Sequence, residues 1–295
     1  MTRQRQSAVL LILLLQAPLS LAAELPTFAG PAMGTTYRVT LAREPGSRRL
    51  GELHRAVDRR LARIDRSLST WRTDSDASRL NAAEADAWVE VGIDLDRVVR
   101  IAQEVHRDTG GRFDITVGPL VSWWRSRLAA ASAAELVAVV PPARLVALTG
   151  SELLEVREAA TGRPPAIRKQ ARGVRIDLSA IGPGYAVDQI GDLLLALGSA
   201  GHLVELGGEV RAWGRQADGR PWRVAVAVET ADGLNRRVLA LADGEAVAVA
   251  AAVPDRPVLD PRTGRLCSGP LPTEPITRAA SCAVADALAT AAVVP

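Results

Sequence analysis

Residues 175–190 read RIDLSAIGPGYAVDQI, in which an apolar strand-like run is followed at once by a glycine-broken turn and a helix-like run. A strand, a tight turn and the start of a helix form an arrangement with which many proteins hold phosphate groups. The spacing matches neither the dinucleotide pattern G-x-G-x-x-G nor the Walker pattern that ends in Gly-Lys-Ser/Thr. Glycine and proline also punctuate ordinary chain reversals. The stretch alone therefore leaves two interpretations open, a phosphate site and a plain turn.

Four segments around this stretch have the pattern of helices. Apolar residues recur at three- and four-residue steps over 50–68 and again over 95–105, which predicts two amphipathic helices. Residues 186–198 (AVDQIGDLLLALG) continue the opening stretch as a helix that closes at its last glycine. Residues 283–293 (AVADALATAAV) predict an alanine-rich helix near the end of the chain.

The remaining segments are mostly strand-like. Polar and apolar residues alternate over 37–41, 202–214 and 222–229, as expected for strands with one buried face. Residues 238–251 (VLALADGEAVAVAA) are expected to form a further strand pair, and residues 126–172 a helix with a surface excursion. Helices and strands that mix without regular βαβ alternation predict an α+β fold.

Composition indicates one globular domain. The 295 residues are 48% hydrophobic and 23% charged, while aromatic residues make up only 3%, so the core must consist mainly of Ala, Val and Leu. No tandem repeat or low-complexity linker divides the chain, and we expect a single domain over residues 23–295. Basic residues are scattered and form no stripe interleaved with aromatic residues, so nucleic acid is not an expected partner.

The first residues, MTRQRQSAVLLILLLQAPLSLAAELP, have the pattern of an export signal. A basic start is followed by an apolar run over residues 8–15, far shorter than the ~20 residues that span a bilayer. Small residues at Ser20 and Ala22 match a signal-peptidase site. We expect a signal peptide over residues 1–22, cleavage near Ala22 or Ala23, and an exported, periplasmic protein. No cysteine lies nearby to carry a lipid.

The cysteines and histidines give no clear catalytic signal. Cys267 and Cys282 either pair in an oxidising compartment or remain two small unpaired residues, and no Cys-x-x-Cys or histidine cluster indicates zinc. His54, His106 and His202 lie in two helical stripes and at a strand start, so we interpret each as structural or superficial.

Carboxylate and hydroxyl groups are better placed for chemistry. Asp286 and Thr290 are four residues apart in a predicted helix, so both oxygens lie on one face. Together with a backbone carbonyl, this pair suits a hard cation such as Mg²⁺. The alternative is a helix with two polar residues facing solvent. Asp114 lies in a glycine-punctuated segment, TGGRFDITVGPL, that by itself predicts only a loop entering a strand.

Seven segments taken in order carry a family resemblance: PAMGTTYRV, IDRSLSTWRTDSDASRLN, TGGRFDITVGPLVSWW, RIDLSAIGPGYAVD, LVELGGEVRAWG, VLDPRTG and ADALAT. The series resembles the ApbE family of exported FAD:protein FMN transferases over roughly residues 29–292. The resemblance implies a single α+β domain related to the T-fold, with FAD in a central cleft and Mg²⁺ near its pyrophosphate. It implies transfer of FMN from FAD, through a phosphoester bond, to a Thr of an exported or membrane flavoprotein, with release of AMP. FAD and this acceptor are then the partners, and peripheral membrane association would come through the acceptor.

The resemblance also implies roles for individual residues. The position whose backbone carbonyl binds the metal is matched by Ala180, and the side-chain metal ligands by Asp286 and Thr290. The turn of the opening stretch would thus serve a pyrophosphate through a cation. The FAD-contacting positions are matched by Met33, Trp71, Arg112, Phe113, Asp114, Pro183 and Asp260.

Some positions depart from the family pattern. A polar residue usually occupies the position of Pro183, and a His usually occupies that of Pro257. The block before DPRTG is shorter than usual, and the sequence ends at Pro295 where the family continues with another strand and helix. We expect an active transferase because the cation ligands are kept. The alternatives are a catalytically weak or inactive FAD-binding homologue and a Mg²⁺-dependent FAD pyrophosphatase.

Overall fold

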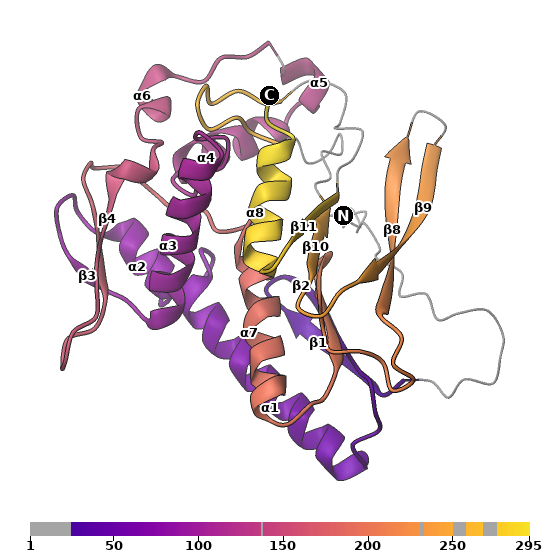
Figure 1. Cartoon of the computed structure of the whole chain (residues 1–295). Coiled ribbons are helices and arrows are strands. Elements are labelled where there is room, and N and C mark those ends of the chain that lie inside the picture. The colour runs from indigo at the N-terminus through magenta and orange to yellow at the C-terminus, as the bar shows by residue number, and fades with distance from the viewer. Residues whose placement is uncertain (1–24, 137, 231–232, 250–257, 268–275) are drawn as a thin grey trace, which may run out of the picture.

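A six-stranded antiparallel sheet forms the centre of the molecule (Figure 1). The computed structural model describes residues 25–136, 138–230, 233–249, 258–267 and 276–295. The strand order is β1-β2-β6-β7-β10-β11. The strands are β1 (Thr27–Ala32), β2 (Thr35–Leu41), β6 (His202–Leu206), β7 (Glu209–Trp213), β10 (Ala246–Val249) and β11 (Ile276–Ala279).

Helices cover one face of this sheet. They are α1 (Ser47–Leu68), α3 (Ile93–Asp108), α7 (Gly182–Ala196) and α8 (Cys282–Ala292), and α8 lies between α3 and the sheet (Figure 1). In β6, Val204 packs into the core shared with the helices, while its neighbour Leu203 packs into the core on the opposite face. This alternation is the two-residue period of a strand buried on both faces.

The opposite face of the sheet is covered by a hairpin. Strands β8 (Trp222–Thr230) and β9 (Gly233–Leu241) pair only with each other within the described residues. Trp222 and Leu241 pack against Val210 and Val247 of the sheet, and the Trp222 indole nitrogen donates to the Trp213 carbonyl at 3.1 Å. The hairpin therefore completes a helix–sheet–hairpin sandwich.

A second, smaller sheet lies beside α2 (Asp76–Ala82) and α3. Its order is β3 (Val89–Glu90), β5 (Ala166–Lys169), β4 (Leu154–Arg157). The sequence has one lysine, Lys169, which is 2% exposed and donates to the Asn81 carbonyl at 3.0 Å. Burial, followed by the charge of Arg175, lowers the pKa of this amine.

Four short helices of the described chain follow α3 and precede β4. These are α4 (Gly118–Leu128), α5 (Ala133–Leu136), α6 (Ala143–Val146) and the 3-10 helix η1 (Ser151–Leu153), and α5 and α6 are seen at the top of Figure 1. They replace the expected single helix and surface excursion over 126–172, which also contains two strands of the small sheet.

The α+β prediction and the four predicted helices are confirmed, with α7 beginning earlier than expected, at Gly182. The expected pairing within 238–251 is wrong. Strand β9 pairs with β8, whereas β10 pairs with β7 and β11. Alternating hydrophobicity reports that a strand has a buried face, and it does not say which strand lies next to it.

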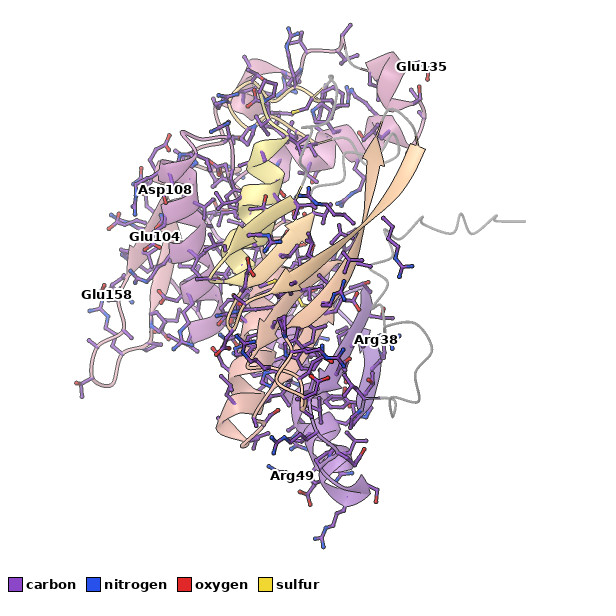
Figure 2. All side chains as sticks on the ribbon, turned by 45° about the vertical axis from the view of Figure 1, so that its right-hand side comes forward. Arg38, Arg49, Glu104, Asp108, Glu135 and Glu158 are labelled. Carbon is purple, nitrogen blue, oxygen red and sulfur yellow. The ribbon has the colours of Figure 1, made fainter. Side chains whose placement is uncertain are left out.

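Charged side chains are spread over the outside of the molecule (Figure 2). Acidic Glu104, Asp108 and Glu158 project on one side, and Arg38 and Arg49 on another. Within the ranges that the structure describes, no helix combines the length and the apolar character needed to cross a membrane.

Candidate functional site

Met33 lies in a tight turn with unusual backbone geometry. It joins β1 to β2 in a two-residue hairpin with Gly34, flanked by the Ala32–Thr35 pair. Both turn residues have positive φ, 49° for Met33 and 80° for Gly34, as a type I′ turn requires. A left-handed conformation is unfavourable for a residue with a side chain such as methionine, and residues held in it are enriched at functional sites. This geometry marks Met33 as a candidate site residue independently of the sequence.

The RIDLSAIGPG turn lies directly beside the FDITVGPL segment. The Asp177 amide donates to the Ile115 carbonyl at 2.7 Å, and the Gly118 amide donates to the Arg175 carbonyl at 3.1 Å. The turn then enters α7, whose first turn contains Pro183. Proline is favoured there because its missing N–H is not needed by the helix. Pro183 thus helps to start α7, and it contributes no donor or charge to a ligand.

The start of α7 meets Met33 and α8. A Cβ atom on Gly182 would lie 3.4 Å from the Met33 methyl carbon. A Cβ on Gly184 would overlap the Cys282 carbonyl at the start of α8, so the two helices cross here backbone to backbone. The Gly184 amide donates to Asp286 Oδ2 at 3.3 Å. The fold therefore brings together Met33, the turn after Ala180, and Asp286.

Asp286 is a buried carboxylate with little compensation. Its residue is 7% exposed, and the long bond from Gly184 is the one hydrogen bond to its side chain among the described residues. Burial, followed by the charge of Glu209, raises the pKa of Asp286 well above its usual range. Burial, together with Glu205, raises the pKa of Glu209 to about 7. An unpaired buried carboxylate is costly, and a bound cation removes that cost.

The residues near Asp286 fit a magnesium ion better than a metal held by protein ligands alone. No described residue donates to the Ala180 carbonyl or exchanges a hydrogen bond with the Thr290 hydroxyl. Thr290 follows Asp286 by four residues within α8, so the predicted shared face is confirmed. In the described part of the chain, no group of three His, Cys, Asp or Glu residues has metal-binding geometry. Mg²⁺ commonly takes one or two carboxylates and completes its shell with phosphate oxygens and water.

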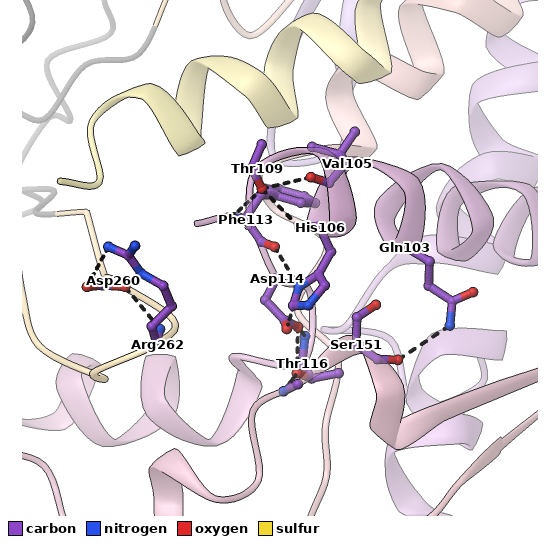
Figure 3. A network of polar contacts seen from close by, with 11 residues as sticks. Gln103, Val105, His106, Thr109, Phe113, Asp114, Thr116, Ser151, Asp260 and Arg262 are labelled. Carbon is purple, nitrogen blue, oxygen red and sulfur yellow. Dashed lines mark hydrogen bonds and ion pairs between the residues drawn. The ribbon is translucent and has the colours of Figure 1, made fainter. Parts of the chain in front are cut away.

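A cavity of about 440 Å³ opens beside Asp114. Thr116 donates to Asp114 Oδ1 from its amide at 2.7 Å and from its hydroxyl at 2.6 Å, and His106 Nδ1 lies 3.0 Å from Asp114 Oδ2 (Figure 3). The hydrogen bond to Asp114 raises the pKa of His106 despite partial burial. The cavity is lined by His106, Arg107, Gly110, Gly111, Asp114, Thr149, Gly150, Glu152, Pro261 and Arg262.

Two features equip this cavity to bind a polar ligand. The Thr149 hydroxyl is buried and has no hydrogen-bond partner in the described structure, so a donor or acceptor on a ligand would satisfy it. Asp260 holds Arg262 from both carboxylate oxygens, at 3.0 and 3.2 Å, at the edge of the cavity (Figure 3). A concave site with a few fixed polar groups is the usual form of a small-molecule pocket.

The other predicted FAD contacts lie at different depths. Phe113 is buried, and its amide donates to the Thr109 hydroxyl at 3.2 Å. Arg112 is exposed, and its Nε donates to the Thr109 carbonyl at 3.1 Å. Trp71 is 79% exposed between α1 and α2, and the Arg125 guanidinium lies 4.9 Å from its ring centre. An exposed tryptophan face is available for stacking on a planar ligand.

Two candidate site residues were missed by sequence reasoning. His106 was interpreted as structural or superficial, yet it pairs with Asp114 at the cavity. Phe113, whose carbonyl lies 3.0 Å from His106 Nδ1, is beyond the end of α3, so no periodicity in the sequence predicted that the chain folds back onto His106. Glu209 follows the two glycines of the LVELGGEVRAWG segment. Its position in one of the seven segments that carry the family resemblance was the only sequence feature that could have indicated a role at the site.

The two cysteines do not form a disulfide. Cys267 and Cys282 are unpaired; Cys282 is buried at the start of α8, and burial raises the pKa of Cys267 to about 11. Pro257 lies outside the described residues, as do the predicted signal peptide and its cleavage position.

Comparisons with known proteins identify the family of this chain. The FAD:protein FMN transferase of Vibrio cholerae serotype O1 is 31% identical, over 94% of this chain and 84% of that protein. The crystal structure of the flavinyl transferase ApbE of Pseudomonas stutzeri, in its apo form, aligns with a TM-score of 0.72 and 30% identity, covering 90% of this chain and 83% of that one. The structure of the flavin transferase ApbE from Vibrio cholerae aligns with a TM-score of 0.71 and 29% identity, covering 91% and 86%. The sequence model of the ApbE family matches residues 33–295. The chain therefore belongs to the ApbE family.

Proposed function

We propose that this protein is a Mg²⁺-dependent FAD:protein FMN transferase. The observation that carries the proposal is the buried, nearly uncompensated Asp286 of α8, which lies against the start of α7 near the left-handed Met33 turn. The resemblance of whole segments and the names of the relatives support the same activity.

In this proposal, Mg²⁺ is held by the Ala180 carbonyl, Asp286 and Thr290. When bound, the ion neutralises the pyrophosphate and acts as a Lewis acid on it. Asp114 and Asp260 hold the adenosine half of FAD at the cavity, together with Arg112 and Phe113. Met33, Trp71 and Pro183 contact the flavin half. Phosphoryl-type transfer needs positioning and charge neutralisation more than covalent help from the protein, which agrees with this residue set.

The proposed reaction exchanges one phosphorus–oxygen bond for another. The hydroxyl oxygen of a Thr on the acceptor forms a bond to the FMN phosphorus, while the anhydride bond between that phosphorus and the AMP oxygen breaks. AMP leaves, and the hydroxyl proton goes to solvent. The product is an acceptor protein that carries FMN through a phosphoester bond.

The proposed place of action is the periplasm. Residues 1–22 act as a cleaved signal peptide before the transferase domain of residues 23–295, and the acceptor is an exported or membrane flavoprotein. N-terminal sequencing of protein recovered from the native periplasm should begin near Ala23 or Glu24. Recovery of an intact Met1 would contradict export by cleavage.

The activity is tested by incubating the protein with FAD, Mg²⁺ and a candidate flavin-carrier domain. Release of AMP together with in-gel flavin fluorescence on the carrier supports the transferase. Release of AMP and FMN without labelling of the carrier identifies a pyrophosphatase instead. FAD binding without AMP release identifies a binding homologue, in which Pro183 and Pro257 mark a lost activity.

A pair of matched variants connects the activity to the site. Asp286→Asn should reduce AMP release by roughly 10²–10³-fold, because a lost electrostatic stabiliser commonly has that effect. Asp94→Asn changes another buried carboxylate, whose hydrogen bonds go to Arg60 and Tyr185 and to none of the proposed cation ligands, and it should leave the rate per folded molecule unchanged. Equal losses in the two variants would contradict the assignment of Asp286.

A further inference from the structure

Asp188 occupies the junction of three elements that surround the candidate metal site. It lies on α7, four residues after Gly184, and both of its carboxylate oxygens are engaged. Oδ1 accepts from Arg211 Nη1 at 2.6 Å and from the Cys282 amide at 2.8 Å. Oδ2 accepts from the Ser281 hydroxyl at 2.8 Å and from the Ala283 amide at 3.0 Å. Four donors saturate one buried carboxylate.

Three of these donors belong to the beginning of α8. The first amides of a helix have no partner within the helix, and a negative charge there is favoured by the helix dipole. Ser281 directly precedes α8 and is its N-cap residue, because its hydroxyl accepts a hydrogen bond from the Val284 amide at 3.4 Å. Asp188 adds a second cap that comes from a different helix. It therefore fixes where α8 begins relative to α7.

The fourth donor ties this cap to the central sheet. Arg211 lies on β7, and its Nε donates to the Gly244 carbonyl at 3.0 Å. Its guanidinium also lies 4.8 Å from the centre of the Trp213 ring. The Arg211 guanidinium thus contacts Asp188, the Gly244 carbonyl and the Trp213 ring, and these contacts fix the position of the Asp188 carboxylate relative to the central sheet.

We propose that Asp188 is a positioning residue that sets α8 against α7 and so places the cation ligands; the inference rests on the proposed function. Asp286 follows Cys282 by one helical turn, and Thr290 follows by a second. A rotation or shift at the start of α8 therefore moves both side chains relative to the Ala180 carbonyl. The backbone contact of Gly184 with Cys282 sets the separation of the helices, and Asp188 sets their register.

A purely stabilising role is the alternative, and the chain offers a matched control for it. Asp94 and Asp188 are similarly buried, 6% and 7% exposed. Asp94 accepts from Arg60 at 2.7 and 2.5 Å and from the Tyr185 hydroxyl at 2.6 Å, so it links α1, α3 and α7 without capping α8. Loss of either carboxylate should lower the melting temperature. Loss of Asp188 alone should weaken cation binding.

The test measures Mn²⁺ binding to the full protein in the presence of FAD, by the electron paramagnetic resonance signal of free Mn²⁺. Asp188→Asn should raise the dissociation constant for Mn²⁺ about 10–100-fold, the usual effect of losing a group that orients metal ligands. Asp94→Asn should leave it within about twofold, because no hydrogen bond of Asp94 reaches α8. An unchanged constant in Asp188→Asn, or equal changes in both variants, would overturn the inference.

A milder variant keeps the test decisive if Asp188→Asn does not fold. Ser281→Ala removes one donor to Asp188 and should weaken Mn²⁺ binding by about two- to fivefold, the equivalent of one modest hydrogen bond. No weakening in Ser281→Ala would then overturn the inference. Mn²⁺ binding by the wild-type protein without AMP release would overturn the transferase proposal and leave this inference supported. Absence of Mn²⁺ binding in the wild type would overturn both.

Discussion

His202 is a neutral base enclosed at the start of β6. Its Nε2 lies 3.1 Å from the Gly191 carbonyl, and its ring stacks on Trp213 with the ring centres 5.0 Å apart. Burial lowers the pKa of His202 from 6.5 to about 4. Between pH 6.5 and pH 4, His202 is protonated in the unfolded chain and neutral in the folded protein. The stability from His202 is therefore complete above about pH 6.5 and is lost as the pH falls toward 4.

The predicted size of this effect is about 3 kcal/mol between pH 7.5 and pH 4, taken from the pKa difference. Urea unfolding of the wild type and of His202→Gln across this range measures it. The variant should be less stable at pH 7.5, and its stability should fall less steeply with acidification. Parallel slopes for the wild type and His202→Gln would refute the prediction.

Single residues could be proposed for the site where whole segments pointed to them. Met33, Asp114 and Asp286 were singled out because each lies in a block of recognisable order. His106 and Glu209 were missed because their importance depends on what the fold brings near them. The strain at Met33 was equally hidden, since a positive φ at a methionine follows from the two-residue turn and not from the residue type.

At the scale of elements, the crossing of α7 and α8 depends on the absence of a side chain at Gly184. Gly184→Ala places a Cβ against the Cys282 carbonyl, which is backbone and has little room to move. We expect a loss of about 3 kcal/mol in the free energy of unfolding, the upper part of the range for overpacking. Urea unfolding monitored by tryptophan fluorescence measures the loss.

Gly51 provides the opposite case for comparison. It lies inside α1, where an added Cβ would meet only the end of the flexible Arg55 side chain, at 3.4 Å. Gly51→Ala should stabilise the protein by about 1 kcal/mol, because alanine is the better helix former. If both alanine variants changed stability in the same direction, the close contact at Gly184 would not be limiting.

Elements with one continuous apolar face were predictable from sequence, as α1 and α3 were. The region 126–172 was not, because its elements are short and depend on contacts across the chain. The pairing of β8 with β9, and of β10 with β7 and β11, was also not predictable. Each of these strands has similar alternation, and partner choice follows from how the sheet and hairpin stack.

At the scale of the whole molecule, the proposed ligands should make the protein more stable. A ligand that binds the folded state alone, at 100 times its dissociation constant, adds about 2.7 kcal/mol. For a domain of this size we expect FAD with Mg²⁺ to raise the melting temperature by about 5 °C. Differential scanning fluorimetry, read through intrinsic tryptophan emission, checks this.

The same measurement separates the parts of the proposed site. EDTA should remove most of the FAD-dependent shift, because the pyrophosphate would face Asp286 without a cation. FMN should produce a smaller shift than FAD, because it lacks the half proposed to occupy the cavity at Asp114. Equal shifts with FMN and FAD would contradict that placement. The overall architecture was predictable to the level of fold class, and the helix–sheet–hairpin layering needed the structure.

The burial of Lys169 gives the protein an unusual behaviour toward acylating reagents. All other basic side chains in the sequence are arginine or histidine. With Lys169 buried, the α-amino group at the start of the chain is the one amine that succinimidyl esters should acylate readily in the native protein. The lysine peptide should stay unmodified in mass-spectrometric mapping of the native protein and become labelled in urea. Its acylation rate under native conditions would then measure the rate at which the three-stranded sheet opens and exposes Lys169, without an engineered probe. Rapid native acylation at this peptide would show that the amine is not enclosed.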